Sequence, residues 1–111
     1  MQHRDKVIIL KIMSEIDIAL NMTYKVDYEE FNIDEMLKRA VCMTVINIGE
    51  LVKSLSEEFR LEHKEIPWKS IAGFRDIAAH KYQTLNMLDV FHTVEKDFPV
   101  LRNNLDKISN E

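Results

Sequence analysis

Apolar residues recur at spacings of three and four along most of this 111-residue sequence, and very little interrupts them. The chain contains only two glycines and two prolines, so signals for tight turns are scarce. A spacing of three and four lines one face of a helix, whereas a sandwich of many strands needs alternation and frequent turns. The sequence therefore predicts an all-α fold, an antiparallel bundle of four to five helices.

The first two helices are placed by their apolar stripes and by one capping signal. An amphipathic pattern predicts a helix over about residues 5–22, and residues 23–31 form a polar, aromatic connection. Asn32 is followed three residues later by Glu35, which is the spacing of a capping box. We expect a second helix to begin there and to run to about residue 62.

The second half of the chain carries two further helices. Pro67 suits the first turn of a helix, and residues 83–85 form a break. Asn86 can cap the last helix, which Pro99 should kink or divide because proline lacks the backbone N–H. The tail after Asp106 is expected to fray.

The middle of the second expected helix is apolar nearly all round. Cys42, Met43 and Ile46 lie off its main apolar stripe. A helix with more than one apolar face must be covered on more than one side, so part of the cover is expected from a second copy of the chain. Gly49 would allow another helix to approach closely there.

Length and charge bound the class of protein. The length fits a single domain over residues 1–111, and its formal net charge is −4. Cys42 is the only cysteine, which favours a reducing, cytoplasmic setting. The apolar run at residues 7–10 is too short and too closely flanked by charges for a signal peptide or a membrane span. Residues 63–82 carry four Lys or Arg against two carboxylates, a small basic patch that suits a local phosphate site.

Three side chains with complementary chemistry lie within this patch. Arg75 is a permanent cation that can grip a phosphate, His80 can move a proton near neutral pH, and Tyr82 adds a hydroxyl and a ring. Arg75 and His80 are five positions apart in the sequence, which corresponds to about 140° around an ideal helix. Either the helix ends before His80, or each cleft uses groups from two protomers. The alternative is a surface arginine, a helix-end histidine and a half-buried tyrosine without joint chemistry.

Two carboxylates are candidates for supporting roles. Asp76 follows Arg75 directly and can pair with it, which would soften the hold of Arg75 on phosphate. Glu50 either orients the cleft or faces solvent, because it belongs to a narrow polar strip on an otherwise apolar helix, formed by Thr44, Asn47, Glu50 and Ser54.

No metal and no other cofactor is expected. His63 and His92 stand apart from His80 and share no ligand spacing with it, whereas zinc needs three or four ligands. Cys42 lies on an apolar helix and is expected in the core.

Several segments together resemble the HepT-like family, within the HEPN superfamily of small helical ribonuclease toxins. The likeness covers roughly residues 34–101, and its signature is an Arg, four residues, His, any residue and Tyr, matched by Arg75, His80 and Tyr82. The family often has Asn where this chain has Asp76. The segments that carry the likeness are Ile48-Gly49-Glu50, Leu55-Ser56-Glu57-Glu58, Glu65-Ile66-Pro67-Trp68, Ile71-Ala72-Gly73, Arg75-Asp76, Ala79-His80-Lys81-Tyr82 and Thr93-Val94-Glu95-Lys96-Asp97-Phe98-Pro99.

The resemblance implies a homodimer whose active cleft lies between protomers and cleaves RNA without metal. The chemistry of the residues agrees, because His80 can transfer the proton and Arg75 can stabilise the charge of the phosphorane. The resemblance also implies a toxin held in check by a small MNT-type nucleotidyltransferase antitoxin, which can transfer AMP to Tyr82. The alternative, from a different class, is a non-catalytic helical module that binds a nucleotide or a partner protein.

Overall fold

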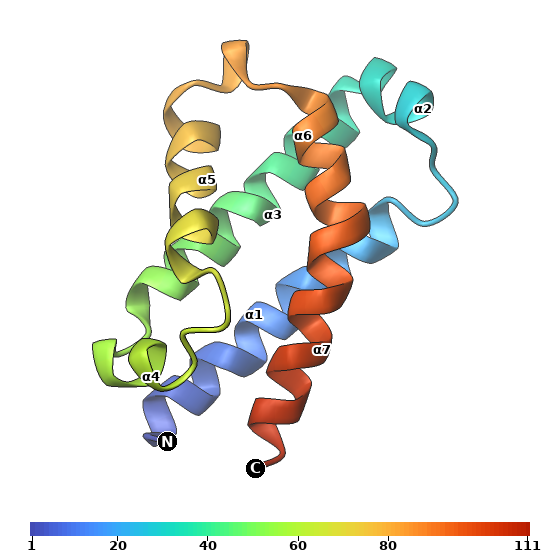
Figure 1. The fold of residues 1–111 in the computed structure, drawn as a ribbon. Helices are drawn as coiled ribbons and strands as arrows, with labels where there is room; N and C mark the ends of the chain where they lie inside the picture. Colours follow the sequence, from blue (N-terminus) through green and yellow to red (C-terminus); the bar gives the residue numbers. More distant parts are fainter.

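The computed structural model describes residues 1–111, and all of its regular elements are helical (Figure 1). This confirms the all-α bundle. None of the helices combines the length and the apolar character that a membrane span needs. The long elements are α1 (His3–Met22), α3 (Glu35–Ser54), α5 (Trp68–His80), and a rod formed by α6 (Met87–His92), the π-helical turn η2 (Thr93–Asp97) and α7 (Phe98–Ser109). The short elements are α2 (Tyr28–Ile33), α4 (Glu57–Glu62) and the 3₁₀ turn η1 (Tyr82–Thr84).

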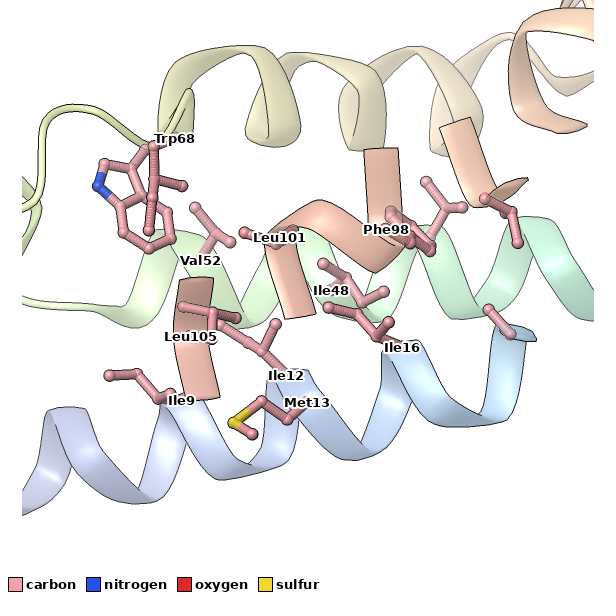
Figure 2. Close-up of a cluster of buried hydrophobic side chains, with 14 of the residues drawn as sticks. Ile9, Ile12, Met13, Ile16, Ile48, Val52, Trp68, Phe98, Leu101 and Leu105 are labelled. Atoms are coloured by element: carbon pink, nitrogen blue, oxygen red, sulfur yellow. The ribbon is translucent and has the colours of Figure 1, made fainter. Parts of the chain in front are cut away.

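The core lies where α1, α3 and α7 meet, and α5 packs along the opposite side of α3. Figure 2 shows apolar side chains of all three helices converging in this space: Ile9, Ile12 and Ile16 from α1, Ile48 and Val52 from α3, and Leu101 and Leu105 from α7. Burial of such apolar surface is the main stabilising contribution in a helical bundle. The turn that carries η1 lies at the end of the bundle opposite both termini (Figure 1).

The start of the second long helix differs from the prediction by two residues. Asp34, not Asn32, caps α3, and its carboxylate accepts a hydrogen bond from the Leu37 N–H at 3.0 Å. Asn32 belongs to α2, a short helix within and just beyond the stretch predicted to be irregular. A reciprocal capping box of Asp27 and Glu30 begins α2. Two adjacent residues can each cap a helix, and apolar spacing does not decide between them.

This helix also ends earlier than expected, at Ser54 rather than near residue 62. Ser56 caps a separate helix, α4, by accepting a hydrogen bond from the Phe59 N–H. The backbone N–H and the hydroxyl of Ser56 both donate to Asp5, at 2.9 and 2.7 Å. Asp5 is 1% exposed, so these bonds satisfy a buried carboxylate and fix the corner between α3 and α4 to α1.

The prediction that Pro99 interrupts the last helix is confirmed. The Phe98 N–H reaches back to the Thr93 carbonyl, five residues earlier, just before Pro99 removes a donor from the ladder. The prediction of a frayed tail after Asp106 is wrong. α7 continues beyond this residue because Ile108 packs into the core.

The apolar middle of α3 is covered mostly within one protomer. Cys42 is buried and Ile46 is half-buried, whereas Met43 is 57% exposed. Only part of the predicted second apolar face therefore remains open to solvent.

Candidate functional site

Arg75 of α5 rests directly on Gly49 of α3. A Cβ atom at position 49 would lie 2.1 Å from the Arg75 Cβ and 2.6 Å from its Cγ, closer than any real contact. Only glycine leaves room for the stem of Arg75, so the approach of the two helices and the place of this arginine are set together. The predicted close approach at Gly49 is confirmed, and the approaching helix is α5 of the same protomer.

The charged end of Arg75 lies between two carboxylates. Its Nε is 2.5 Å from Glu50 Oε1, and its Nη1 donates to Asp76 Oδ1 at 3.1 Å. Lys53 Nζ lies 2.6 Å from the same Asp76 oxygen. The Lys53 ammonium, followed by the Arg75 guanidinium, holds the pKa of Asp76 below its ordinary value. We call Glu50, Lys53, Arg75 and Asp76 the Arg75 cluster.

Of the predicted polar strip on α3, only Glu50 reaches Arg75. Thr44 is buried and donates to the Ala40 carbonyl. Asn47 donates to Glu15 of α1, and the Ser54 hydroxyl returns to the Glu50 carbonyl. The strip is therefore divided among different partners and is not one solvent-facing row.

His80 is the last residue of α5, and its imidazole is exposed, with no hydrogen bond or ion pair to the rest of the chain. The helix therefore does not end before His80. Arg75 and His80 project about 140° apart, so one protomer does not aim both at one point. A shallow hollow lined by residues 79–84 opens beside the imidazole.

Tyr82 lies in η1 and is held by a second group of charges. Its hydroxyl donates to Glu35 Oε1 at 3.2 Å, and the Arg39 guanidinium lies 4.9 Å from the centre of its ring. Arg39 and Lys38 both pair with Glu35 as well. Burial, followed by the hydrogen bond and the charge of Glu35, raises the pKa of the Tyr82 phenol. We call Glu35, Lys38, Arg39 and Tyr82 the Tyr82 cluster.

The two clusters lie at different heights on α3. Glu35 and Glu50 are fifteen residues apart on this helix, which at the helical rise corresponds to about 22 Å. Within one protomer, the predicted site residues are therefore not brought together: Arg75, Glu50 and Asp76 lie in one cluster, Tyr82 lies in the other, and His80 lies in neither.

Cys42 is not available for chemistry. Burial raises the pKa of its thiol to about 11, so the thiol stays protonated at neutral pH. No group of three or more His, Cys, Asp or Glu side chains is arranged to hold a metal ion.

Lys53 and Arg39 belong to the two clusters but were not predicted from the sequence. Lys53 is three residues after Glu50 and Arg39 is four after Glu35, so each lies on the same face of α3 as the carboxylate that was noticed. This spacing was the available signal. Only the packing of α5 and η1 against α3 shows that Lys53 contacts Asp76 and that Arg39 lies over the Tyr82 ring.

Comparison with known proteins adds an independent line of observation. The family model described as "Ribonuclease HepT-like" matches residues 12–108. The chain is 35% identical over 109 residues to "Putative RNase MJ0125" of Methanocaldococcus jannaschii, covering 97% of this chain and 94% of that one. It is also 35% identical over 97 residues to "Putative RNase TTE0752" of Caldanaerobacter subterraneus subsp. tengcongensis, covering 87% of each.

A third relative carries the family name itself. "Probable ribonuclease HepT" of Thermococcus cleftensis is 30% identical over 97 residues, covering 87% of this chain and 88% of that one. No solved structure matches the chain significantly. The family match spans most of the bundle and includes both clusters, and the relatives align over nearly their whole length. This chain therefore belongs to the HepT-like ribonuclease family.

Proposed function

We propose that this chain is a metal-independent RNA endonuclease that acts as a homodimer and is the toxin of a toxin–antitoxin pair. One observation carries the proposal: Arg75 is fixed against Gly49, while His80, further along the same helix, is exposed and has no intramolecular partner. A fixed cation and a free imidazole are the two groups that RNA cleavage without metal requires.

In the proposed reaction, a ribose 2′-oxygen attacks the adjacent phosphorus and the bond from phosphorus to the 5′-oxygen breaks. A neutral His80 imidazole takes the 2′-hydroxyl proton, and a protonated imidazole gives a proton to the departing 5′-oxygen. Arg75 stabilises the charge that develops on the phosphoryl oxygens. The products are a 2′,3′-cyclic phosphate and a 5′-hydroxyl.

A homodimer would supply what one protomer lacks. Arg75 and His80 of one chain diverge around α5, whereas two copies across a two-fold axis bring two of each to one cleft. Exposed apolar side chains on α3 and α5 support such an interface. Met36 and Met43 are seven residues apart on one face of α3 and are 83% and 57% exposed, and Ile77 of α5 is 48% exposed.

The catalytic test compares three alanine variants on one oligoribonucleotide in EDTA. His80→Ala and Arg75→Ala are each expected to lose about a hundredfold or more in cleavage while remaining folded dimers. The exposed His92, on α6 and outside both clusters, gives the matched control His92→Ala, which should cleave normally. A requirement for added magnesium, or full activity in His80→Ala, would exclude this mechanism.

We further propose that an MNT-type nucleotidyltransferase antitoxin transfers AMP to Tyr82. Tyr82 is half-buried in an otherwise exposed turn, and the one hydrogen-bond partner of its hydroxyl is the Glu35 carboxylate. The added phosphate would lie near Arg39 and Lys38 of its own protomer, so it would block Arg75 only across the cleft between protomers.

Intact-mass analysis after co-expression with such a nucleotidyltransferase tests this modification. Wild type should gain one AMP unit or more and lose cleavage, whereas Tyr82→Phe should keep both its mass and its activity. Suppressed activity with an unchanged wild-type mass would mean inhibition by binding alone.

The second candidate function is a non-catalytic module that binds a nucleotide or a partner protein. The observation in its favour is that Glu50 and Asp76 neutralise Arg75 from two sides. RNA binding with no cleavage by the wild-type dimer would favour this function.

A further inference from the structure

A single oxygen atom in the Arg75 cluster lies between two cations from different helices. Asp76 Oδ1 is 2.6 Å from Lys53 Nζ of α3 and 3.1 Å from Arg75 Nη1 of α5. Lys53 has no other partner in the chain. An oxygen held by an ammonium and a guanidinium occupies the position that a phosphate oxygen takes when two basic side chains bind it.

The Lys53–Asp76 pair contributes little to holding the helices together. The side chains of Lys53 and Asp76 are 40% and 50% exposed, and ion pairs at such exposure add little stability. The two helices are already joined by the contact of Arg75 with Gly49 and by buried apolar residues such as Ile48. The arrangement therefore matters more for the local electrostatic field than for the fold.

We propose that Lys53 and Arg75 together form a subsite for a backbone phosphate of RNA, and that Asp76 occupies this subsite when no RNA is bound. The inference rests on the proposed function and assigns a role to Lys53. The four charges of the Arg75 cluster cancel, so an incoming phosphate gains little until the Asp76 carboxylate swings aside into solvent. Because its two cations lower the pKa of Asp76, the carboxylate stays charged at neutral pH and competes with phosphate.

The direction in which two substitutions change RNA affinity distinguishes this subsite from a contact that only joins the two helices. If Lys53 and Asp76 only joined α3 to α5, removing either charge would have the same effect. If they are a phosphate ligand and its competitor, Lys53→Met weakens RNA binding and Asp76→Asn strengthens it. Lys53→Arg keeps the charge and should retain most of the affinity.

The measurement is fluorescence anisotropy with a labelled single-stranded oligoribonucleotide across a salt series, in a His80→Ala background that leaves the RNA intact. Lys53→Met is expected to weaken binding about tenfold and to lower the slope of log K against log salt by about 0.7, the value for one lost phosphate contact on a single strand. Asp76→Asn should tighten binding severalfold. Lys107→Met removes an exposed lysine of α7, outside both clusters and outside the basic patch of residues 63–82, and should change neither quantity.

Equal affinity and slope in Lys53→Met and its parent would overturn the subsite, as would weaker binding in both Lys53→Met and Asp76→Asn. Thermal unfolding of each variant by circular dichroism verifies that a changed affinity is not a loss of fold. The nuclease proposal fails separately. If the wild-type protein does not cleave RNA, but Lys53→Met weakens RNA binding and Asp76→Asn strengthens it, the subsite is supported and the nuclease proposal is excluded.

Discussion

The Arg75 cluster and the Tyr82 cluster share one kind of contact but differ in how tightly the motif residue is packed. In each, a carboxylate of α3 contacts a motif residue from the segment that follows: Glu50 contacts Arg75 and Glu35 contacts Tyr82. Arg75 is also wedged against Gly49, which leaves no room for a Cβ, whereas the only hydrogen-bond partner of the Tyr82 hydroxyl is the exposed Glu35 carboxylate. The first cluster is therefore part of the packing of α5 against α3, and the second lies outside that contact.

The largest effect is expected from Gly49→Ala, which tests whether Arg75 is part of the helix packing. Its new Cβ overlaps the stem of Arg75, and overpacking of this kind costs about 1–3 kcal/mol. We expect a lower midpoint in chemical denaturation together with a loss of RNA cleavage. Gly73→Ala is the matched control, because a Cβ there meets nothing within 4 Å and helix propensity alone should stabilise α5 by up to about 1 kcal/mol. Equal stability of the two variants would contradict the wedge.

A smaller effect is expected when the two motif residues are changed conservatively. Arg75→Lys keeps the charge but loses the planar fork, so cleavage should fall about tenfold to a hundredfold. Tyr82→Phe keeps the ring beside Arg39 and should stay within about threefold of wild type. The measurement is kcat/KM on one oligoribonucleotide. If Tyr82→Phe lost as much as Arg75→Lys, the phenol would belong to the chemistry rather than to control.

The smallest expected effect is on the titration of the Tyr82 phenol. Burial and Glu35 raise its pKa, so the ultraviolet difference between wild type and Tyr82→Phe should have a midpoint above 10, the ordinary value for tyrosine. Glu35→Gln should lower that midpoint. A phenol with a raised pKa stabilises the fold fully below pH about 10, and this contribution is lost as the pH rises through the folded-state pKa. A midpoint unaffected by Glu35→Gln would mean that Glu35 does not hold the phenol.

The bundle could be predicted because periodicity reports directly on which face of a helix is buried. The errors lie at helix ends, where one hydrogen bond decides between neighbours. Asn32 and Asp34 can both cap, and the break before Ser56 depends on a bond to Asp5, fifty-one residues earlier in the sequence. Tertiary contacts decide where such helices end, and a local sequence pattern contains no information about those contacts.

The candidate site could likewise be predicted only in part. Arg75, His80 and Tyr82 are visible as a motif within eight residues, and Glu50 is visible as a polar residue on an apolar helix. That Gly49 seats Arg75, and that Lys53 shares an oxygen with it, depends on how α5 lies against α3. No spacing within either helix contains that information.

The contact between Gly49 and Arg75 also has a genetic consequence. Glycine is the only residue without a Cβ, so every missense change in this codon places an atom on the arginine. If expression of the protein arrests growth, colonies that survive should carry substitutions at codon 49 as readily as at codon 75. Codon 73 encodes the other glycine of the chain, which lies on α5 with nothing within 4 Å of an added Cβ, and changes there should be almost absent from these colonies.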